Sequence, residues 1–275
     1  MPLVGFGTYK VTGEQVERVL DDALKVGYRL LDTAKVYNNE KEIGKAFEKL
    51  LPKHCLRRED VFITTKLHPS SENTRDSIVK MVDESLRLLR TSYVDLYLIH
   101  YPKPNDCHND DTDNIEYRKN AYMSLEACKE AAKIRSIGVS SYEIKHLEEV
   151  KSYANCQPSV NQIEFHPHFI RTELVEYCKN ANIFVQAFSS LAKWNEDLFA
   201  SDAVKCLAEK YRVDPSTIVL SFATCQNIGI IPKSSHIERM KKNIKVIHLT
   251  SCDVDRFAHL NINQHYVRTT GWFVK

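Results

Sequence analysis

The sequence predicts a closed α/β barrel, the (β/α)8 or TIM barrel, in which eight parallel strands alternate with helices. Short apolar, β-branched runs alternate with longer segments of helical periodicity along almost the whole chain. Strict alternation of this kind indicates parallel strands joined by right-handed crossovers. The chain has 275 residues, and such a barrel takes about 250 as one unit. We therefore expect residues 1–275 to form a single barrel domain.

Eight runs are candidates for the strands, because each is short, apolar and followed by a turn. They are Leu3–Phe6, Tyr28–Leu31, Val61–Thr65, Val94–Ile99, Ile134–Val139, Val160–Ile163, Ile183–Ala187 and Ile228–Ile231. An open, doubly wound sheet is the alternative, and it usually carries a GxGxxG turn after its first strand. Here the only GxG is Gly5-Phe6-Gly7, and no third glycine follows it. This absence argues against the open sheet.

Helical segments occupy the intervals between the strands. In the first, Glu14–Val26, apolar residues recur on one face of a helix. The crossover helices that follow are Asn39–Leu50, Thr74–Leu89, Ile115–Ala132, Glu143–Tyr153, Thr172–Asn180, Pro215–Cys225 and Ile237–Val246. Ser201–Tyr211 is one extra helix. Thr12 with Gln15 predicts a capping box before the first helix, and Gly27 suits a position of positive φ just after it. Residues 102–114 and 188–200 are expected to be long loops.

Composition excludes several function classes. The formal net charge is only +2, which gives no electrostatic reason to expect nucleic acid or an anionic membrane as a partner. No apolar run approaches the ~18 residues of a membrane span, and no signal peptide is evident. The eight cysteines are scattered without a CxxC pair, which argues against a metal site and against a disulfide framework. We expect reduced cysteines and a cytoplasmic protein.

Polar and aromatic residues follow the predicted strands at their carboxyl ends, where the loops of a barrel form its active site. Asp32 and Tyr37 follow the second strand, Lys66 the third and His100 the fourth. Further residues of this kind follow the later strands: Ser140, Ser141, Asn161, Gln162, His166, Phe188, Ser189, Ser190, Lys233, Ser234 and Ser235. Polar residues scattered at random over the surface would not recur at the carboxyl end of one predicted strand after another.

Each of the first four residues also has an ordinary structural interpretation. Asp32 could hold a turn, Tyr37 could be a half-buried aromatic, Lys66 a snorkelling surface lysine and His100 a core histidine with a hydrogen-bond partner. Their conjunction favours function, because adjacent strand ends bring an acid, a phenol, an ammonium and an imidazole within reach of one another.

This set of groups suits the reduction of a carbonyl. A phenol has a pKa of about 10, which is high for a proton donor at neutral pH. An ammonium at Lys66 would favour the ionised phenol of Tyr37, and Asp32 would keep Lys66 charged. His100 would orient a carbonyl oxygen, to which Tyr37 gives its proton. No side chain supplies a hydride, so a nicotinamide cofactor must.

A local anion site follows the eighth strand. Lys233, Ser234, Ser235 and Arg239 offer two cations and two hydroxyls around a helix start. Barrels of this class often bind phosphate near their last strands, and the 2′-phosphate of NADPH fits such a site. The alternative is a helix N-terminus whose basic residues are solvated.

The chain resembles the aldo-keto reductase superfamily, in particular its aldose reductase-like branch. The motifs that carry the resemblance run in order along the chain: Gly5-Phe6-Gly7-Thr8, GYRLLDTAKVYNNEKEIG at 27–44, TTKL at 64–67, DLYLIHYP at 95–102, IRSIGVSSY at 134–142, NQIEFHPH at 161–168 and IPKSS at 231–235. The resemblance implies that Asp32, Tyr37, Lys66 and His100 are the catalytic tetrad.

The resemblance also implies an NADPH site. Its expected residues are Gly7, Thr8, Tyr9, Asp32, Ser140, Ser141, Gln162, Phe188, Ser189, Leu191, Lys233, Ser234, Ser235, Arg239 and Asn243. Several positions in and near this site depart from the family pattern, which has Asn at Ser141, Tyr at Phe188, Glu at Lys242, and often Trp at Tyr9 and Tyr101. Substrate is expected to contact Tyr37, His100 and Tyr101, and Tyr9 and Trp194 make the pocket partly aromatic. The loop after Leu191 is short, and so is the C-terminal segment that ends in Gly271–Lys275.

The predicted function is NADPH-dependent reduction of aldehydes and ketones to alcohols, with Tyr37 as proton donor. The substrate is expected to be a small carbonyl compound, the protein a monomer, and metal, nucleic acid and membrane are expected to play no part. One alternative is a nucleotide-binding regulatory or structural relative with little turnover. Another is oxidation of an alcohol with NAD⁺, against which the phosphate-suited cations argue.

Overall fold

The computed structural model of the chain describes residues 1–267. One eight-stranded sheet runs in the order β1 to β8, and every neighbouring pair is parallel. The strands are β1 (Phe6–Gly7), β2 (Leu30–Asp32), β3 (Phe62–Leu67), β4 (Val94–Ile99), β5 (Ile134–Ser140), β6 (Val160–Glu164), β7 (Phe184–Phe188) and β8 (Gly229–Ile230). Each of these strands overlaps one of the eight predicted runs, so the prediction of eight strands is confirmed.

The first strand closes the sheet into a barrel by pairing on both sides. Phe6 and Gly7 pair with β2, whereas the residues before them pair with β8. The amide of Gly5 donates to the carbonyl of Ile230 at 2.8 Å, and the amide of Ile230 donates to the carbonyl of Leu3, also at 2.8 Å. Since all eight strands then have neighbours on both sides, the sheet has no open edge.

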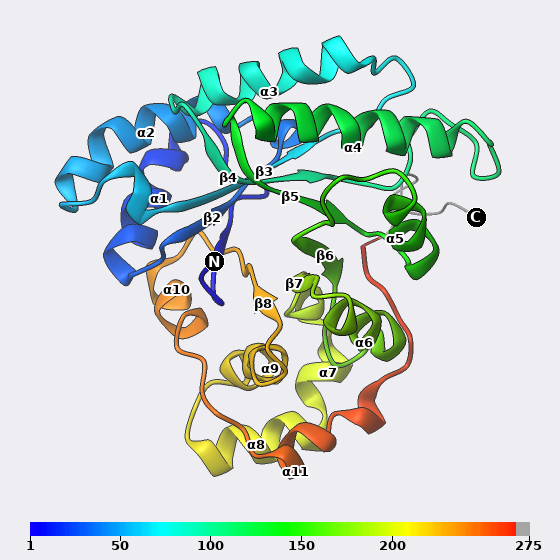
Figure 1. The fold of residues 1–275 in the computed structure, drawn as a ribbon. Coiled ribbons are helices and arrows are strands. Elements are labelled where there is room, and N and C mark those ends of the chain that lie inside the picture. Colours follow the sequence, from blue (N-terminus) through cyan, green and yellow to red (C-terminus); the bar gives the residue numbers. More distant parts are fainter. Residues whose placement is uncertain (268–275) are drawn as a thin grey trace.

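Helices form an outer layer around the strands (Figure 1). The crossover helices are α1 (Gln15–Val26), α2 (Glu40–Lys53), α3 (Arg75–Leu89), α4 (Asn114–Glu130), α5 (Ile144–Lys151), α6 (Thr172–Asn180), α9 (Pro215–Thr224) and α10 (Ile237–Asn243). The predicted extra helix is α8 (Asp202–Tyr211), and the short α7 (Glu196–Ala200) and α11 (Ser251–Asp255) accompany it. Short 3-10 turns complete the described part of the chain: η1 (Lys35–Tyr37), η2 (Arg58–Asp60), η3 (Ala192–Trp194) and η4 (Ala258–Leu260).

The two ends of α1 test the local predictions made for it. The capping box of Thr12 and Gln15 is wrong: Glu14 precedes the helix in helical conformation, and no side chain caps the first turn. The carbonyl of Gly13 instead accepts from the amide of Val16 at 3.2 Å, which continues the helical turn backward. Gly27 is confirmed in the left-handed region, with φ 112°. Its backbone N–H donates back into the last turn of α1, as a glycine C-cap does.

The two predicted loops differ in outcome. Residues 102–113 contain no regular element and lead directly into α4, as expected. Residues 188–200 are more ordered than a plain loop, because they hold both η3 and α7. The side chain of Asn195 accepts a hydrogen bond from the amide of Leu198 at 3.0 Å and so starts α7. Gly271–Lys275, the end of the C-terminal segment expected to be short, lies outside the described residues. No helix between residues 1 and 267 is both long enough and apolar enough to cross a membrane.

A close contact between α2 and α3 depends on a glycine. A Cβ placed on Gly44 would lie 2.1 Å from the carbonyl oxygen of Leu88 and 2.8 Å from the carbonyl carbon of Leu89. Both are backbone atoms, so the helices would have to move apart to admit even one methyl group.

We predict that Gly44→Ala lowers the free energy of unfolding by about 1–3 kcal/mol, the usual cost of overpacking. The clash should outweigh the better helix propensity of alanine, which is worth about 1 kcal/mol. The measurement is urea unfolding followed by circular dichroism. Lys45→Ala, on the exposed face of the same helix, is the control and should change stability little. An unchanged or higher midpoint for Gly44→Ala would contradict the close contact.

Candidate active site

The predicted reactive residues lie together at one end of the barrel. Asp32 is the last residue of β2, Lys66 lies near the end of β3, and His100 follows β4 directly. Tyr37 ends the short turn η1, five residues after β2. Parallel pairing places β2 beside β3 and β3 beside β4, so the three strand ends are neighbours at the mouth.

A buried ion pair forms the base of this site. Lys66 Nζ donates to Asp32 Oδ1 at 2.6 Å and to the carbonyl of Thr33 at 2.9 Å. The two residues are only 1% and 2% exposed. The second carboxylate oxygen of Asp32 accepts from Gln162 Nε2 at 2.8 Å. Burial lowers the pKa of Lys66, and the charge and hydrogen bond of Asp32 oppose that shift. Both oxygens of the carboxylate therefore have donors, as a buried charge requires.

Tyr37 lies against this pair. Lys66 Nζ is 5.2 Å from the centroid of its ring. The pKa of Tyr37 is nevertheless raised well above that of a free phenol, first by burial and then by the negative charge of Asp32. The expectation that Lys66 lowers this pKa is therefore wrong for the protein without cofactor. The physical reason is that Asp32 balances the ammonium at bonding distance, while burial disfavours a phenolate. Tyr37 is a protonated phenol at neutral pH.

His100 completes the group. Its ring meets that of Tyr37 edge-on, with centroids 5.9 Å apart, and stacks on Tyr101 at 4.4 Å. Burial lowers the pKa of His100 well below its usual value, and the nearby Lys66 and His68 lower it further. Nδ1 of His100 is buried and has no hydrogen-bond partner among residues 1–267. The imidazole is thus neutral, and its Nδ1 is free to form a hydrogen bond with a ligand.

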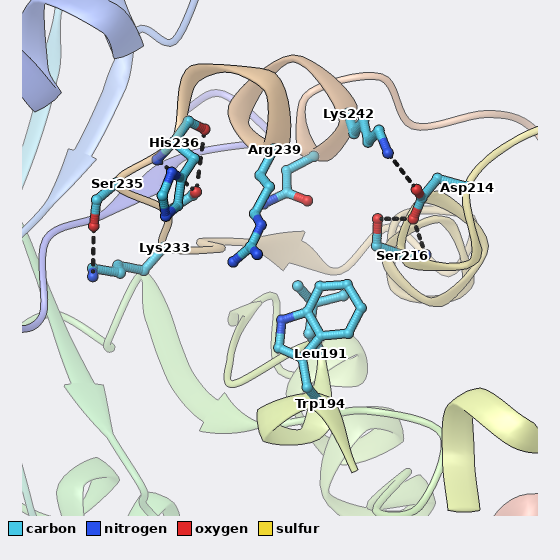
Figure 2. A pocket seen from close by; sticks show the side chains of 11 residues that line it. Leu191, Trp194, Asp214, Ser216, Lys233, Ser235, His236, Arg239 and Lys242 are labelled. Carbon is cyan, nitrogen blue, oxygen red and sulfur yellow. Dashed lines mark hydrogen bonds and ion pairs between the residues drawn. The ribbon is translucent and has the colours of Figure 1, made fainter. Parts of the chain in front are cut away.

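A cavity of about 320 Å³ opens beside β8 and α10 (Figure 2). We call it the second cavity, because it is separate from the barrel mouth that holds the reactive residues. Six of the predicted cofactor residues line it: Leu191, Lys233, Ser234, Ser235, Arg239 and Asn243. The wall also includes Trp194, Asp214, Ser216, His236 and Lys242. Asp214 and Ser216 were missed because they start α9, away from any strand end. The sequence signal there, an Asp before Pro-Ser, indicates only a helix cap.

The charges in this cavity are unequally paired. Lys242 Nζ lies 2.7 Å from Asp214 Oδ2 and forms an ion pair with it. Lys233 Nζ donates only to the hydroxyl of Ser235, at 3.1 Å. Arg239 makes no hydrogen bond or ion pair with any residue in the described part of the chain, and Figure 2 shows it extending into the cavity. Two cations thus lack an acidic partner there, which favours an anionic ligand.

Between the mouth and this cavity lie other predicted cofactor residues. Ser140 and Gln162 pair across β5 and β6, and both are buried. Ser141 has φ 60°, and its hydroxyl is buried without a partner among residues 1–267. An unsatisfied buried hydroxyl is a position that a ligand can satisfy. Phe188 and Ser189, at the end of β7, are both partly exposed.

The remaining predicted cofactor residues are Tyr9, Thr8 and Gly7. Some lie where they can contact a ligand, and others support the structure around the site. Tyr9 is 57% exposed, and its ring centroid is 5.2 Å from that of Tyr37. Thr8 is fully buried, and its hydroxyl donates to the carbonyl of Asp32 at 2.9 Å, so its side chain supports Asp32 instead of facing a ligand. A Cβ on Gly7 would lie 2.7 Å from the carbonyl oxygen of Ile231. The glycine allows β1 to approach the chain after β8.

Some strand-end residues are not brought to the site. Asn161 is fully buried and donates to the carbonyl of Tyr142 at 2.9 Å. His166 is buried and lies 3.0 Å from Glu164, and the hydroxyl of Ser190 donates to a backbone carbonyl. Trp194, expected near the substrate, lies instead with the cofactor residues of the second cavity. The part of the chain that the structure describes contains no group of three His, Cys, Asp or Glu side chains fit to hold a metal ion.

Comparison with known proteins identifies relatives along the whole chain. The model of the aldo/keto reductase family matches residues 3–262. The NAD(P)H-dependent D-xylose reductase I,II of Candida tropicalis is 33% identical over 99% of this chain and 93% of its own length. The D-galacturonate reductase of Hypocrea jecorina is 34% identical over 92% of this chain and 85% of its own.

Solved structures agree with this result. An aldo-keto reductase of Bombyx mori, solved in complex with NADP, superposes with a TM-score of 0.89 at 28% identity. It covers 99% of this chain and 93% of its own. The aldose reductase of Schistosoma japonicum superposes with a TM-score of 0.87 at 28% identity, over 97% and 91% of the two chains. The eight-stranded barrel is therefore shared with solved members of one family.

We predict that the ring of His100 stays neutral between about pH 5 and 8, because burial and Lys66 both disfavour its imidazolium form. The ¹⁵N shifts of its ring, assigned by comparison with a His100→Gln variant, should not titrate over this range. A titration midpoint near the ordinary histidine pKa of about 6.5 would contradict the buried, neutral site.

Proposed function

Because the chain belongs to the aldo/keto reductase family, we propose that Asp32, Tyr37, Lys66 and His100 carry out its reaction. The protein is an NADP-dependent oxidoreductase of the aldose reductase-like branch, and it reduces carbonyl groups to alcohols. The observation that carries the residue assignment is the protonated phenol of Tyr37 between a buried ammonium and a neutral imidazole.

The residues of the second cavity fit NADPH. This cofactor, when bound, supplies the hydride that no side chain can provide. Lys233, Ser234 and Arg239 would hold its phosphate, because two of them are cations that have no acidic partner among residues 1–267. Ser140, Ser141 and Gln162 would hold the nicotinamide end beside the barrel mouth, where Ser141 has a hydroxyl to spare. Phe188 offers a ring face at the end of β7.

At the barrel mouth the protein has to orient the substrate, donate a proton and stabilise the phenolate that remains. His100, as a neutral imidazole, can donate a hydrogen bond to the carbonyl oxygen of the substrate and so orient it. Tyr37 then gives its proton to that oxygen. The phenolate left behind is stabilised by the ammonium of Lys66, which Asp32 keeps charged and fixed in place. The raised pKa of Tyr37 ensures that the proton is present before the reaction begins.

The alternative of a nucleotide-binding relative with little turnover is not favoured. All four residues are present and assembled, and the curated relatives are reductases by name. We further propose that the whole chain acts as one domain and as a monomer, on a small carbonyl compound and without nucleic acid. All eight cysteines are unpaired, which supports a cytoplasmic location.

We predict that Tyr37→Phe lowers the rate of carbonyl reduction by about 10²- to 10⁴-fold, the usual contribution of a general acid. The measurement is NADPH absorbance with a panel of reactive aldehydes. D-xylose and D-galacturonate belong in the panel, because two relatives are named for them. NADPH affinity should stay unchanged, since the substitution removes only one hydroxyl.

The control for this experiment is Tyr93→Phe. Tyr93 precedes β4 at the other end of the barrel, and its hydroxyl has no partner among residues 1–267. The same chemical change there should leave the rate intact. A Tyr37→Phe enzyme with wild-type turnover would exclude Tyr37 as the proton donor.

We predict that Arg239→Ala weakens NADPH binding by about 10- to 150-fold, the worth of a hydrogen bond to a charged group, and NADH binding much less. The reason is that NADH lacks the 2′-phosphate. Dissociation constants from calorimetry would measure both. Lys241→Ala removes a cation from the same helix, but one paired with Glu238 outside the cavity, and should change neither affinity. Equal losses for the two cofactors would contradict the phosphate assignment and reopen the NAD⁺-dependent alternative.

A further inference from the structure

We propose that Gln186, in β7, is a positioning residue that acts through Gln162. The two side chains form a hydrogen bond inside the barrel, and this bond fixes which atom of the Gln162 amide faces the mouth. The inference rests on the proposed function, because that function assigns the nicotinamide end of the cofactor to Gln162. It goes beyond that function by giving a role to a buried residue that neither the strand-end pattern nor the family resemblance singles out.

Gln186 lies in the interior of the barrel. Side chains alternate between the two faces of a strand, so Gln186 shares its face of β7 with Phe184, two residues before it. Phe184 packs against a small apolar cluster of strand residues, Leu96, Leu98 and Val160. Gln186 is fully buried and pairs in register with Gln162 of β6. It therefore lies between this apolar cluster and the barrel mouth.

A glutamine at this position has an energetic cost that calls for a compensating contact. The interior of such a barrel is filled mainly by branched apolar side chains, and buried polar groups need hydrogen-bond partners. Nε2 of Gln186 is buried and has no partner among residues 1–267. An apolar side chain of the same length would leave no atom unsatisfied. What the glutamine contributes here is therefore its carbonyl oxygen.

That oxygen accepts the second hydrogen of the Gln162 amide. Nε2 of Gln162 lies 2.8 Å from Asp32 Oδ2 and 2.7 Å from Gln186 Oε1. An amide nitrogen carries two hydrogens and a carboxylate can only accept, so one N–H donates to Asp32 and the other to Gln186. The Gln162 amide cannot turn over without losing both bonds. Asp32 alone would hold only one of the two hydrogens.

The fixed orientation leaves one atom of Gln162 for a ligand. Nothing within residues 1–267 donates a hydrogen bond to its carbonyl oxygen, Oε1, whereas both hydrogens of its Nε2 are used. A carbonyl oxygen accepts from the N–H groups of a carboxamide, such as that of nicotinamide. Gln186 thus ensures that Gln162 offers an acceptor and not a donor at this point. A turned amide would offer the wrong group and misplace the ring that carries the hydride.

The first readout needs no cofactor. In protein with ¹⁵N-labelled glutamine, the side-chain N–H signals of Gln162, assigned with Gln162→Met, should exchange slowly with solvent. In Gln186→Met the group should exchange about 2- to 12-fold faster, the worth of one neutral hydrogen bond. Gln186→Glu should keep the slow exchange, because burial and the charge of Asp32 favour the protonated acid, whose carbonyl oxygen still accepts. Equal exchange in wild type and Gln186→Met would contradict the hydrogen bond.

The second readout is NADPH-dependent turnover of an aldehyde in a double-mutant cycle. We expect Gln186→Met to lower kcat by about 10- to 100-fold, as a small misplacement of a reacting group does, and Gln186→Glu to lower it far less. In a Gln162→Met background, Gln186→Met should lower kcat no further, because the amide through which Gln186 acts is already gone. An equal loss in both backgrounds would show that Gln186 acts independently of Gln162 and would overturn the inference.

The matched control is Gln226→Met. It makes the same chemical change just after α9, where Gln226 Nε2 donates to the carbonyl of Phe222 at 2.8 Å, and it should alter neither readout. Circular dichroism would confirm that each variant is folded. If Gln186→Glu loses as much kcat as Gln186→Met, the role of the acceptor oxygen is wrong and the proposed function stands. A wild-type protein that oxidises NADPH with no aldehyde would overturn the proposed function, and the cofactor role of Gln186 with it.

Discussion

The buried ion pair between Lys66 and Asp32 is the interaction on which the rest of this structure depends. A charge with almost no exposure to water is tolerated only where partners satisfy it. Asp32 meets this condition through Lys66 and Gln162, from β3 and β6 on different sides of the barrel. Thr8, after β1, donates to its backbone carbonyl. The carboxylate of Asp32 thus couples β2 to β3 and β6, and the backbone of the same residue couples to the segment after β1, so the closed barrel and the geometry of the site are one arrangement.

The same pair decides which protonation states the site holds. Because Asp32 offsets the ammonium, Tyr37 experiences little net positive charge, and burial keeps it a neutral phenol. His100 lies close enough to Lys66 for the remaining positive charge to disfavour a second cation. The result is one proton donor and one neutral hydrogen-bonding ring beside a fixed charge. The ammonium becomes important when Tyr37 loses its proton, because a phenolate there interacts with Lys66 far more strongly than a phenol does.

Binding and chemistry occupy separate parts of the molecule. The reactive groups belong to β2, β3, β4 and the turn after β2, which pack tightly and are largely buried. The second cavity is formed by the segment after β8, the short helix α10 and the turn η3. Its cations and its indole are exposed to solvent. Because the two parts are separate, a change in the cavity, such as Lys242 where the family pattern has Glu, leaves the ion pair beside Tyr37 undisturbed.

The sequence by itself determined the strands, their parallel order and the residues at their carboxyl ends, because side-chain periodicity and strand ends are local properties that chain order carries into the barrel. Asp32, Tyr37, Lys66 and His100 could be predicted for that reason. Only the tertiary structure decided the direction of the pKa shift of Tyr37, the supporting position of Thr8, the uncapped start of α1 and the place of Trp194. Each of these depends on burial or on distances between segments far apart in the chain, and neither quantity can be read from a local pattern.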